Sequence, residues 1–416
     1  MGPACEAERA FDVAIVGMAC LLPKAPDLET YWRNILGKVD AITEVPADRW
    51  DWRGYFDPDP DAPDKVYSRW GGFLDEIPFD PVSYGIPPSS LPSIEPLQLL
   101  TLHVVREALS DAGYLDRPFD RRRASVILGV GGGFAELGHR YALRAGLASV
   151  FEEVSPEILS GLPEWTADSF AGILHNVAAG RVANRFDLGG VNYTVDAACA
   201  SSLTAIHLAA RELEAGTSDL VIAGGAETVQ NPFAYLALSK TQALSPTGRC
   251  RTFDEAADGI AIGEGVAVVV LKRVVDAEAG GDRIYAVIKG VGGSSDGRAV
   301  GLTAPRPEGQ VLALERAYAQ AGLSPASVSL IEAHGTGTVA GDQAEVEALR
   351  RVFEAAGAPR RGCAIGSVKS MIGHTRRAAG VAAMIKVAKA LYHKVLPPTI
   401  NVERPNERAG FCDSPF

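Results

Sequence analysis

Continuous runs of apolar residues recur along the chain, and they predict strands that are buried on both faces. The clearest runs are residues 12–18, 125–130, 220–225 and 265–271. They lack the polar and apolar alternation of a half-exposed strand, and they are shorter than most helices. We therefore expect a sheet that helices cover on both sides.

Helical periodicity separates these runs. Apolar residues at three- and four-residue spacing predict a helix from Pro96 to Gly113 and another from Cys199 to Gly216. Residues 135–176 also have a helical pattern. Residues 46–96 are rich in proline, aspartate and aromatic residues without a sustained period, which predicts a long ordered surface segment.

The same alternation restarts after residue 280. It predicts strands at 284–290, 329–333 and 364–368, and helices at 308–321, 342–356 and 380–393. Two such halves, residues 11–273 and 282–416, predict an α/β layer sandwich. The duplication is one of pattern, because the sequence itself does not repeat.

Composition narrows the class of protein. The chain has 416 residues, is 47% hydrophobic and carries a net charge of −11, which speaks against nucleic acid as a partner. Its six cysteines are scattered without paired spacing, so we expect neither disulfides nor a metal site. No apolar run reaches membrane length, and the first residues do not resemble a secretion signal. These features predict a cytoplasmic globular protein without a membrane span.

A glycine run at residues 129–133 follows one predicted strand and superficially suggests nucleotide binding. It lacks the G-x-G-x-x-G spacing and the acidic residue that a dinucleotide site requires. A tight strand exit where the backbone approaches a substrate explains the glycines better.

Cys199 is the first candidate catalytic residue. It lies where the strand-like residues 190–194 give way to a helix, so unpaired backbone N–H groups and the helix dipole favour its thiolate. An isolated cysteine among alanines is otherwise more often a small core residue. Residues elsewhere in the chain support the catalytic interpretation.

Two histidines follow predicted strands in the second half. His334 follows residues 329–333, and His374 follows residues 364–368, with Lys369 five positions before it. A loop histidine beside glycines is usually structural. Two of them, each at a strand exit as Cys199 is, indicate an active site. The other histidines lack such settings.

Residues 196–202, 332–338 and 367–374, in this order, resemble the motifs of the β-ketoacyl synthase (ketosynthase) family of fatty acid and polyketide synthases. The similarity runs from Asp12 almost to the end of the chain. Residues 69–73, 85–88 and 250–265 further resemble the bacterial iterative type I branch, which makes polyunsaturated fatty acids, glycolipid chains or polyene-type products.

The resemblance implies a thiolase-like five-layer α-β-α-β-α sandwich of two similar halves, and a homodimer. It implies decarboxylative Claisen condensation between an enzyme-bound acyl group and malonyl on the phosphopantetheine of an acyl carrier protein. No tightly bound cofactor, metal or nucleotide is needed.

The resemblance also assigns roles to residues. Cys199 accepts the acyl group, and neutral His334 and His374 donate N–H groups to the malonyl thioester oxygen. Lys369 keeps positive charge near the site and pairs with Glu345. The remaining assignments are pantetheine binding for Thr336 and Thr338, and structural support of the site for Asp342 and Glu345.

Three alternative functions differ in the residues that they require. A catalytically silent partner subunit that sets chain length would lack the nucleophile, whereas Cys199 is present. A thiolase-type acyltransferase uses a second cysteine where this chain has His374. A serine hydrolase would need a G-x-S-x-G turn, which we do not find.

The sequence departs from the family pattern at two places. Arg376 and Arg377 follow His374, and they either are solvated surface residues or contact the pantetheine phosphate or an acidic carrier protein. Residues 121–123 and 360–361 are competing candidates for the docking patch. The chain also ends at Phe416, before the phenylalanine-containing loop and final strands of the family. We therefore expect a missing oxyanion-hole donor and slow condensation.

Overall fold

The computed structural model describes residues 12–131, 135–299, 301 and 303–416, and the statements below concern these ranges. Two glycines of the 129–133 run lie outside them. Strands formed by the described residues are β1 (Val13–Leu21), β2 (Ile42–Glu44), β3 (Trp70–Gly72), β4 (Ala124–Gly129), β5 (Asn192–Val195), β6 (Leu220–Glu227), β7 (Ile262–Gly263), β8 (Gly265–Arg273), β9 (Ala286–Ile288), β10 (Leu330–Glu332) and β11 (Ala364–Gly366).

The largest sheet of the described residues has six strands in the order β5-β4-β6-β8-β1-β9. Strands β4, β5 and β6 run parallel, so their carboxyl ends lie at one edge of the sheet. The pairs β6–β8, β8–β1 and β1–β9 are antiparallel. Because helices cover both faces, the strands need no polar face, which explains their continuous apolar runs.

Successive side chains of this sheet enter two different hydrophobic cores. Val221 and Ala223 lie in one cluster, and Leu220 and Ile222 lie in the other. Strand β1 follows the same rule but contains an irregularity between Ile15 and Gly17, consistent with a β-bulge. The predicted two-sided burial of these strands is confirmed.

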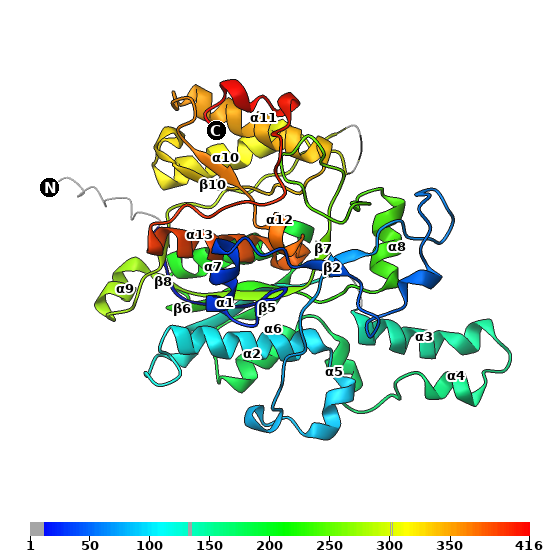
Figure 1. Cartoon of the computed structure of the whole chain (residues 1–416). Helices are drawn as coiled ribbons and strands as arrows, with labels where there is room; N and C mark the ends of the chain where they lie inside the picture. Colours follow the sequence, from blue (N-terminus) through cyan, green and yellow to red (C-terminus); the bar gives the residue numbers. More distant parts are fainter. Residues whose placement is uncertain (1–11, 132–134, 300, 302) are drawn as a thin grey trace.

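Helices pack on both faces of the six-stranded sheet (Figure 1). One face carries α2 (Pro96–Asp111) and α6 (Val177–Arg185), and the other carries α1 (Leu28–Leu36), α7 (Ser201–Glu214) and α13 (Ala379–His393). The helix predicted from Pro96 ends two residues before the predicted Gly113. The helix predicted to start at Cys199 begins instead at Ser201.

A second, two-stranded sheet lies beyond α13. Its parallel strands β10 and β11 pack on their far side against α10 (Pro307–Ala321) and α11 (Val339–Ala355). Figure 1 shows these elements above the larger sheet. The predicted strand at 284–290 is shorter than expected, and as β9 it joins the sheet of the first half by pairing with β1.

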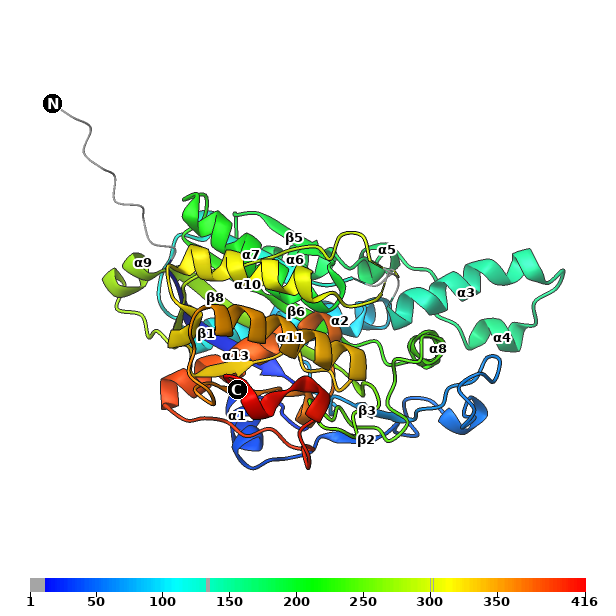
Figure 2. The ribbon, with the colours of Figure 1, turned by 90° about the horizontal axis from the view of Figure 1, so that it is seen from above.

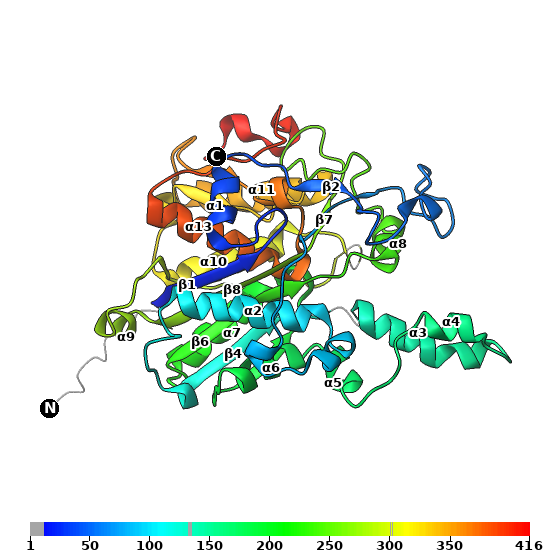
Figure 3. The same cartoon turned by 60° about the horizontal axis from the view of Figure 1, so that its bottom comes forward.

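The predicted surface segment at 46–96 is mostly irregular, but it contains β3, which joins β2 and β7 in a small sheet. The predicted helical region at 135–176 comprises α3 (Glu136–Val150), α4 (Pro156–Ser160) and α5 (Ser169–Ile173). Helices α3 and α4 project from the body of the molecule (Figures 2 and 3). The remaining helices are α8 (Pro232–Lys240), α9 (Val274–Ala279) and α12 (Lys369–Ile372).

Candidate active site

Cys199 lies in a tight turn between strand β5 and helix α7. A single 3-10 turn, η5 (Ala198–Ala200), leads into the helix. Ala198 has a φ of 49°, a left-handed conformation that is unfavourable for a residue with a side chain. The carboxylate of Asp196 stabilises this turn by accepting the N–H of Ala198 at 3.0 Å. The loop therefore presents Cys199 from a conformation that the structure around it must hold in place.

The prediction that this position favours the thiolate is wrong for the structure. Burial raises the pKa of the Cys199 thiol above its usual range, although the positive charges of Lys369, Arg376 and Arg377 act in the opposite direction. Loss of water around the sulfur outweighs the neighbouring cations. Cys199 is therefore a neutral thiol at pH 7, and its proton must leave when it attacks a thioester.

His334 follows strand β10, as predicted, and a carboxylate of helix α11 holds its loop by hydrogen bonds. The carboxylate of Glu345 on α11 accepts the backbone N–H of His334 at 2.6 Å and that of Gly335 at 2.8 Å. Part of His334 is exposed. Burial of its ring nevertheless lowers the pKa of His334 to about 3, and the positive charge of Lys369 acts in the same direction. The imidazole is neutral at physiological pH.

His374 follows α12 and is almost completely buried, with 2% of its surface exposed. Burial lowers its pKa well below the usual range, and the charges of Lys369 and Arg376 act in the same direction. Its Nδ1 accepts the backbone N–H of Arg376 at 3.1 Å. Because Nδ1 is an acceptor in a neutral ring, the proton must be on Nε2. The ring can therefore donate one N–H to a substrate oxygen.

The two histidine rings meet edge to face, with centroids 5.3 Å apart and planes at 85°. Lys369 is buried beside them, and its charge influences the pKa of Cys199, His334 and His374 alike. The structure thus gathers three of the predicted catalytic side chains, Cys199, His334 and His374, around the fourth, Lys369.

Lys369 does not pair with Glu345 in the way that the resemblance implies. The ammonium and the carboxylate influence each other's pKa, but the described residues show no ion pair between them. Backbone N–H groups occupy the carboxylate of Glu345 instead. Burial lowers the pKa of Lys369, and it raises the pKa of Glu345.

The predicted pantetheine residues lie on the loop after His334. The hydroxyls of Thr336 and Thr338 hydrogen-bond to each other at 3.0 Å. Asp342 holds this loop by accepting the N–H of Gly337 at 3.1 Å and that of Phe253 at 2.7 Å. Burial, together with the charge of Glu345, raises the pKa of Asp342 to about 7.

The interpretation of Arg376 and Arg377 as solvated surface residues is wrong, whereas their contact with the pantetheine phosphate or an acidic carrier protein stays a prediction. Each side chain is 15% exposed, and both form ion pairs with the buried carboxylate of Glu227. The arginines lie in a 3-10 turn, η7 (Arg376–Ala378), before α13. Of the competing patches, Arg123 pairs with Asp219 and Arg360 with Asp413.

Sequence reasoning missed two buried carboxylates around the site. Glu227 ends strand β6, and Glu332 ends strand β10, where it pairs with Lys386 at 2.5 Å and accepts the N–H of Val368. The signal for Glu227 is a charge at the end of a fully apolar strand. Glu332 was part of a recognised motif, but it had no assigned role.

The described residues contain no group of side chains suited to hold a metal ion. Their cysteines are all free thiols. None of their helices combines the length and apolarity that a membrane crossing requires.

Comparison with known proteins identifies the family. Residues 10–277 match the family described as "Beta-ketoacyl synthase, N-terminal domain", and residues 285–403 match "Beta-ketoacyl synthase, C-terminal domain". The chain belongs to the β-ketoacyl synthase family, whose members are acyltransferases.

Relatives of the chain are domains of large synthases. It is 41% identical to a polyunsaturated fatty acid synthase protein of Thraustochytrium sp., over 94% of this chain and 14% of that protein. It is also 41% identical to phthioceranic/hydroxyphthioceranic acid synthase of Mycobacterium tuberculosis, over 98% of this chain and 18% of that protein. The chain thus spans less than a fifth of the curated relatives it matches here.

A solved ketosynthase has the same fold. The ketosynthase from module 6 of the bacillaene synthase of Bacillus subtilis superimposes with a TM-score of 0.83 at 37% identity, covering 97% of this chain and 65% of that chain. The mixed α/β fold is therefore that of ketosynthases.

Proposed function

We propose that this chain is a chain-extending ketosynthase domain that catalyses decarboxylative Claisen condensation. The observation that supports this most strongly is the grouping of Cys199 with two neutral histidines around Lys369. A neutral thiol supplies the nucleophile. Two neutral imidazoles supply hydrogen-bond donors without competing as bases.

In the first half-reaction, Cys199 attacks the carbonyl carbon of an acyl thioester. A C–S bond forms to the enzyme, the C–S bond to the carrier breaks, and the thiol proton leaves with the carrier sulfur. The cations that oppose the raised pKa of Cys199 stabilise the sulfur as it becomes negative. The acyl group then remains on the enzyme while the second substrate binds.

In the second half-reaction, the bond between the malonyl carboxylate and the adjacent carbon breaks, and CO₂ leaves. Its electrons move into the thioester, and His334 and His374 donate N–H groups to the oxygen of the enolate. The enolate carbon attacks the acyl carbonyl on Cys199, and the thiolate leaves and regains a proton. Removal of one such donor costs about 2.7–4 kcal/mol of barrier.

The malonyl group arrives on the phosphopantetheine arm of an acyl carrier protein. The paired hydroxyls of Thr336 and Thr338 can open to hydrogen-bond this arm, because each hydroxyl donates and accepts. No step in this scheme calls for a metal or a tightly bound cofactor. The proposed compartment is the cytoplasm.

We assign the thiolase-like five-layer architecture and a homodimer to the same proposal. The layer order supports the first: α2 and α6, the large sheet, α7 and α13, the β10–β11 sheet, and α10 and α11 (Figure 1). For the second, β5 is an edge strand that pairs only with β4 on one side, and Val191 just before it is exposed. Light scattering after size-exclusion chromatography tests the dimer, and a monomer at micromolar concentration would contradict it.

A labelled acyl primer and malonyl-loaded carrier protein test the function. We expect the primer to shift the protein mass at Cys199, and the product to be two carbons longer with a β-keto group. Loading without extension would identify a silent or impaired subunit. Condensation of two acyl groups without loss of CO₂ would identify a thiolase-type enzyme. Either result would overturn the proposal.

A further inference from the structure

Glu227 is a buried carboxylate that holds two arginines at once. It ends strand β6, and its side chain is 3% exposed. Its Oε1 lies 3.1 Å from Nη2 of Arg376, and its Oε2 lies 2.6 Å from Nη1 of Arg377. The N–H of Val229 also donates to Oε1 at 3.1 Å. One carboxylate therefore bridges two adjacent cations inside the protein.

Arg376 connects Glu227 to His374. Its φ is 45°, a left-handed conformation that a non-glycine residue adopts only when its surroundings hold it. The ion pair with Glu227 and a hydrogen bond to the carbonyl of Val229 fix its guanidinium. In this conformation the backbone N–H of Arg376 points back to Nδ1 of His374 at 3.1 Å.

Arg377 connects Glu227 to the loop of Cys199. Its Nε lies 3.3 Å from Oδ1 of Asp196, and its Nη2 lies 3.4 Å from Oδ2. That same Oδ1 accepts the N–H of Ala198, the left-handed residue just before the nucleophile. The path from Glu227 to the Cys199 turn thus runs through two residues, Arg377 and Asp196, and three contacts.

We propose that Glu227 is a positioning residue that couples the two catalytic loops. Through Arg376 it keeps His374 in the Nε2–H tautomer, and through Arg377 and Asp196 it supports the turn that presents Cys199. The inference rests on the proposed function, because it assigns the reaction steps to these two loops. It also gives both arginines of this pair a role in positioning.

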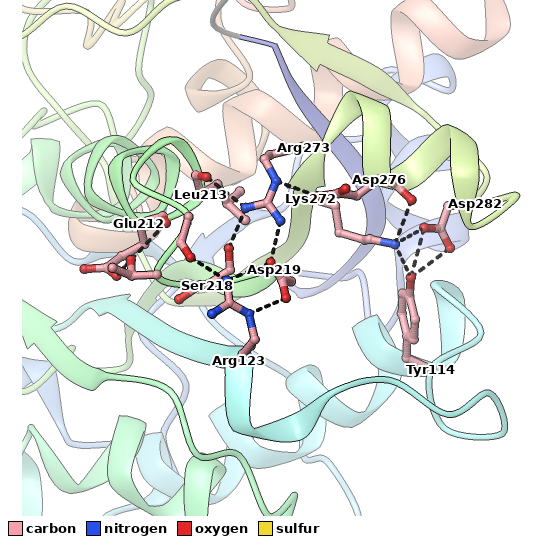
Figure 4. A network of polar contacts seen from close by, with 12 residues as sticks. Tyr114, Arg123, Glu212, Leu213, Ser218, Asp219, Lys272, Arg273, Asp276 and Asp282 are labelled. Carbon is pink, nitrogen blue, oxygen red and sulfur yellow. Dashed lines mark hydrogen bonds and ion pairs between the residues drawn. The ribbon is translucent and has the colours of Figure 1, made fainter. Parts of the chain in front are cut away.

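A carboxylate at the opposite end of the same strand provides a matched control. Asp219 directly precedes β6 and pairs with Arg123 and Arg273 (Figure 4). It lies at the amino edge of the parallel strands, whereas Cys199 follows their carboxyl edge. The substitutions Glu227→Gln and Asp219→Asn each remove one charge from between two arginines. Only the first removes it from the arginines that contact the catalytic loops.

The test compares three variants with the wild-type chain. We expect Glu227→Gln to lower kcat for malonyl decarboxylation by about 100-fold with little change in KM, since small misplacement of a catalytic group has effects of this size. We expect Glu227→Asp to recover a large part of kcat, and Asp219→Asn to retain wild-type kcat. In protein labelled with ¹⁵N-histidine, the His374 signal should lose its Nε2–H pattern only in Glu227→Gln.

A second substitution keeps the test decisive if Glu227→Gln does not fold. Arg377→Lys retains a cation beside Glu227 but loses the forked contact with Asp196. We expect it to slow acylation of Cys199 by about tenfold and to change decarboxylation less. Equal activity of Glu227→Gln and Asp219→Asn, or equal effects of Arg377→Lys on both steps, would overturn the inference. An inactive wild-type chain would instead overturn the proposed function.

Discussion

The two ends of strand β6 carry the same kind of ion-pair cluster, with different consequences. At the amino end, Asp219 lies between Arg123 and Arg273, and its side chain is 40% exposed (Figure 4). At the carboxyl end, Glu227 lies between Arg376 and Arg377, and its side chain is 3% exposed. Hydrogen bonding to Arg123 lowers the pKa of Asp219 to about 2, with Arg273 acting in the same direction.

The two clusters differ in the residues that surround them, and the sheet topology determines these residues. Strands β4, β5 and β6 are parallel, so the turn containing Cys199 after β5 and the end of β6 lie at the same edge of the sheet, with β4 between them. Ligand sites in α/β sheets form at such carboxyl edges. Another network at the amino edge joins Asp282 to Lys272 and Tyr114, and each of these groups pairs with the others (Figure 4). Charge clusters alone therefore do not mark a reactive site.

The first prediction tests whether the reaction depends on the residues at the carboxyl edge of the sheet. We expect Cys199→Ala to reduce acyl loading by at least about a thousandfold, because the proposed thioester forms on the Cys199 thiol. Intact-protein mass spectrometry measures the loading. Cys412→Ala is the control, since this cysteine is exposed and its carbonyl accepts a hydrogen bond from Arg360. Acylation of the Cys199→Ala chain at another cysteine would place the nucleophile elsewhere.

We expect the ion pairs at the amino end of strand β6 to contribute to stability and not to catalysis. Asp282 has 1% of its side chain exposed and pairs with Lys272 and Arg117. Asp282→Asn leaves these cations without a carboxylate, so we expect a loss of about 3 kcal/mol in the free energy of unfolding. Urea unfolding measures this loss, and activity per folded molecule should remain unchanged. A stable Asp282→Asn chain with impaired activity would reverse the contrast between the two ends.

Asp342 predicts how stability depends on pH near the site. Its folded pKa of about 7 is raised above the unfolded value, so its protonated form favours folding. This contribution is present below about pH 4 and is lost as pH rises to about 7. We expect the wild-type chain to lose up to about 1.4 kcal/mol per pH unit in this window from this group.

The control for that effect is Asp342→Asn, which cannot ionise. Its stability should be lower overall, but it should vary less with pH between 4 and 7. Thermal unfolding across this range measures both chains. Identical pH dependence in the two chains would show that Asp342 does not carry the effect.

The smallest expected effect concerns the thiol itself. Because the pKa of Cys199 is raised above its usual range, alkylation by iodoacetamide should still accelerate between pH 8 and pH 9.5. Lys369→Met removes a cation that lowers this pKa, so alkylation at a given pH should slow further. A rate that is already maximal at pH 7 would indicate a thiolate.

The sequence predicted the strands and the main helices, and it singled out three candidate catalytic side chains, because each leaves a local pattern. Buried strands are continuous apolar runs, and the motifs around Cys199, His334 and His374 are contiguous. The position of β9 could not be predicted, because a short apolar run does not specify its partner strand.

The ion pairs of the two arginines and the protonation state of Cys199 also could not be predicted from the sequence. Arg376 and Arg377 resemble surface residues because charged pairs usually are exposed, and their partner Glu227 lies about 150 positions earlier. The helix-start position of Cys199 suggested a thiolate, but the extent of its burial depends on residues from several distant segments. Burial and long-range pairing therefore decided the points on which the predictions failed.

The central claim is that Cys199 and the histidines serve separate steps, and His374→Ala tests it most directly. Acyl loading by mass spectrometry and CO₂ release from malonyl carrier protein are measured on the same sample, with His207→Ala on α7 as the control. We expect near-wild-type loading and a decarboxylation rate lower by about 100- to 1000-fold. Equal loss of loading and decarboxylation would contradict the account, because it would make His374 the base for Cys199.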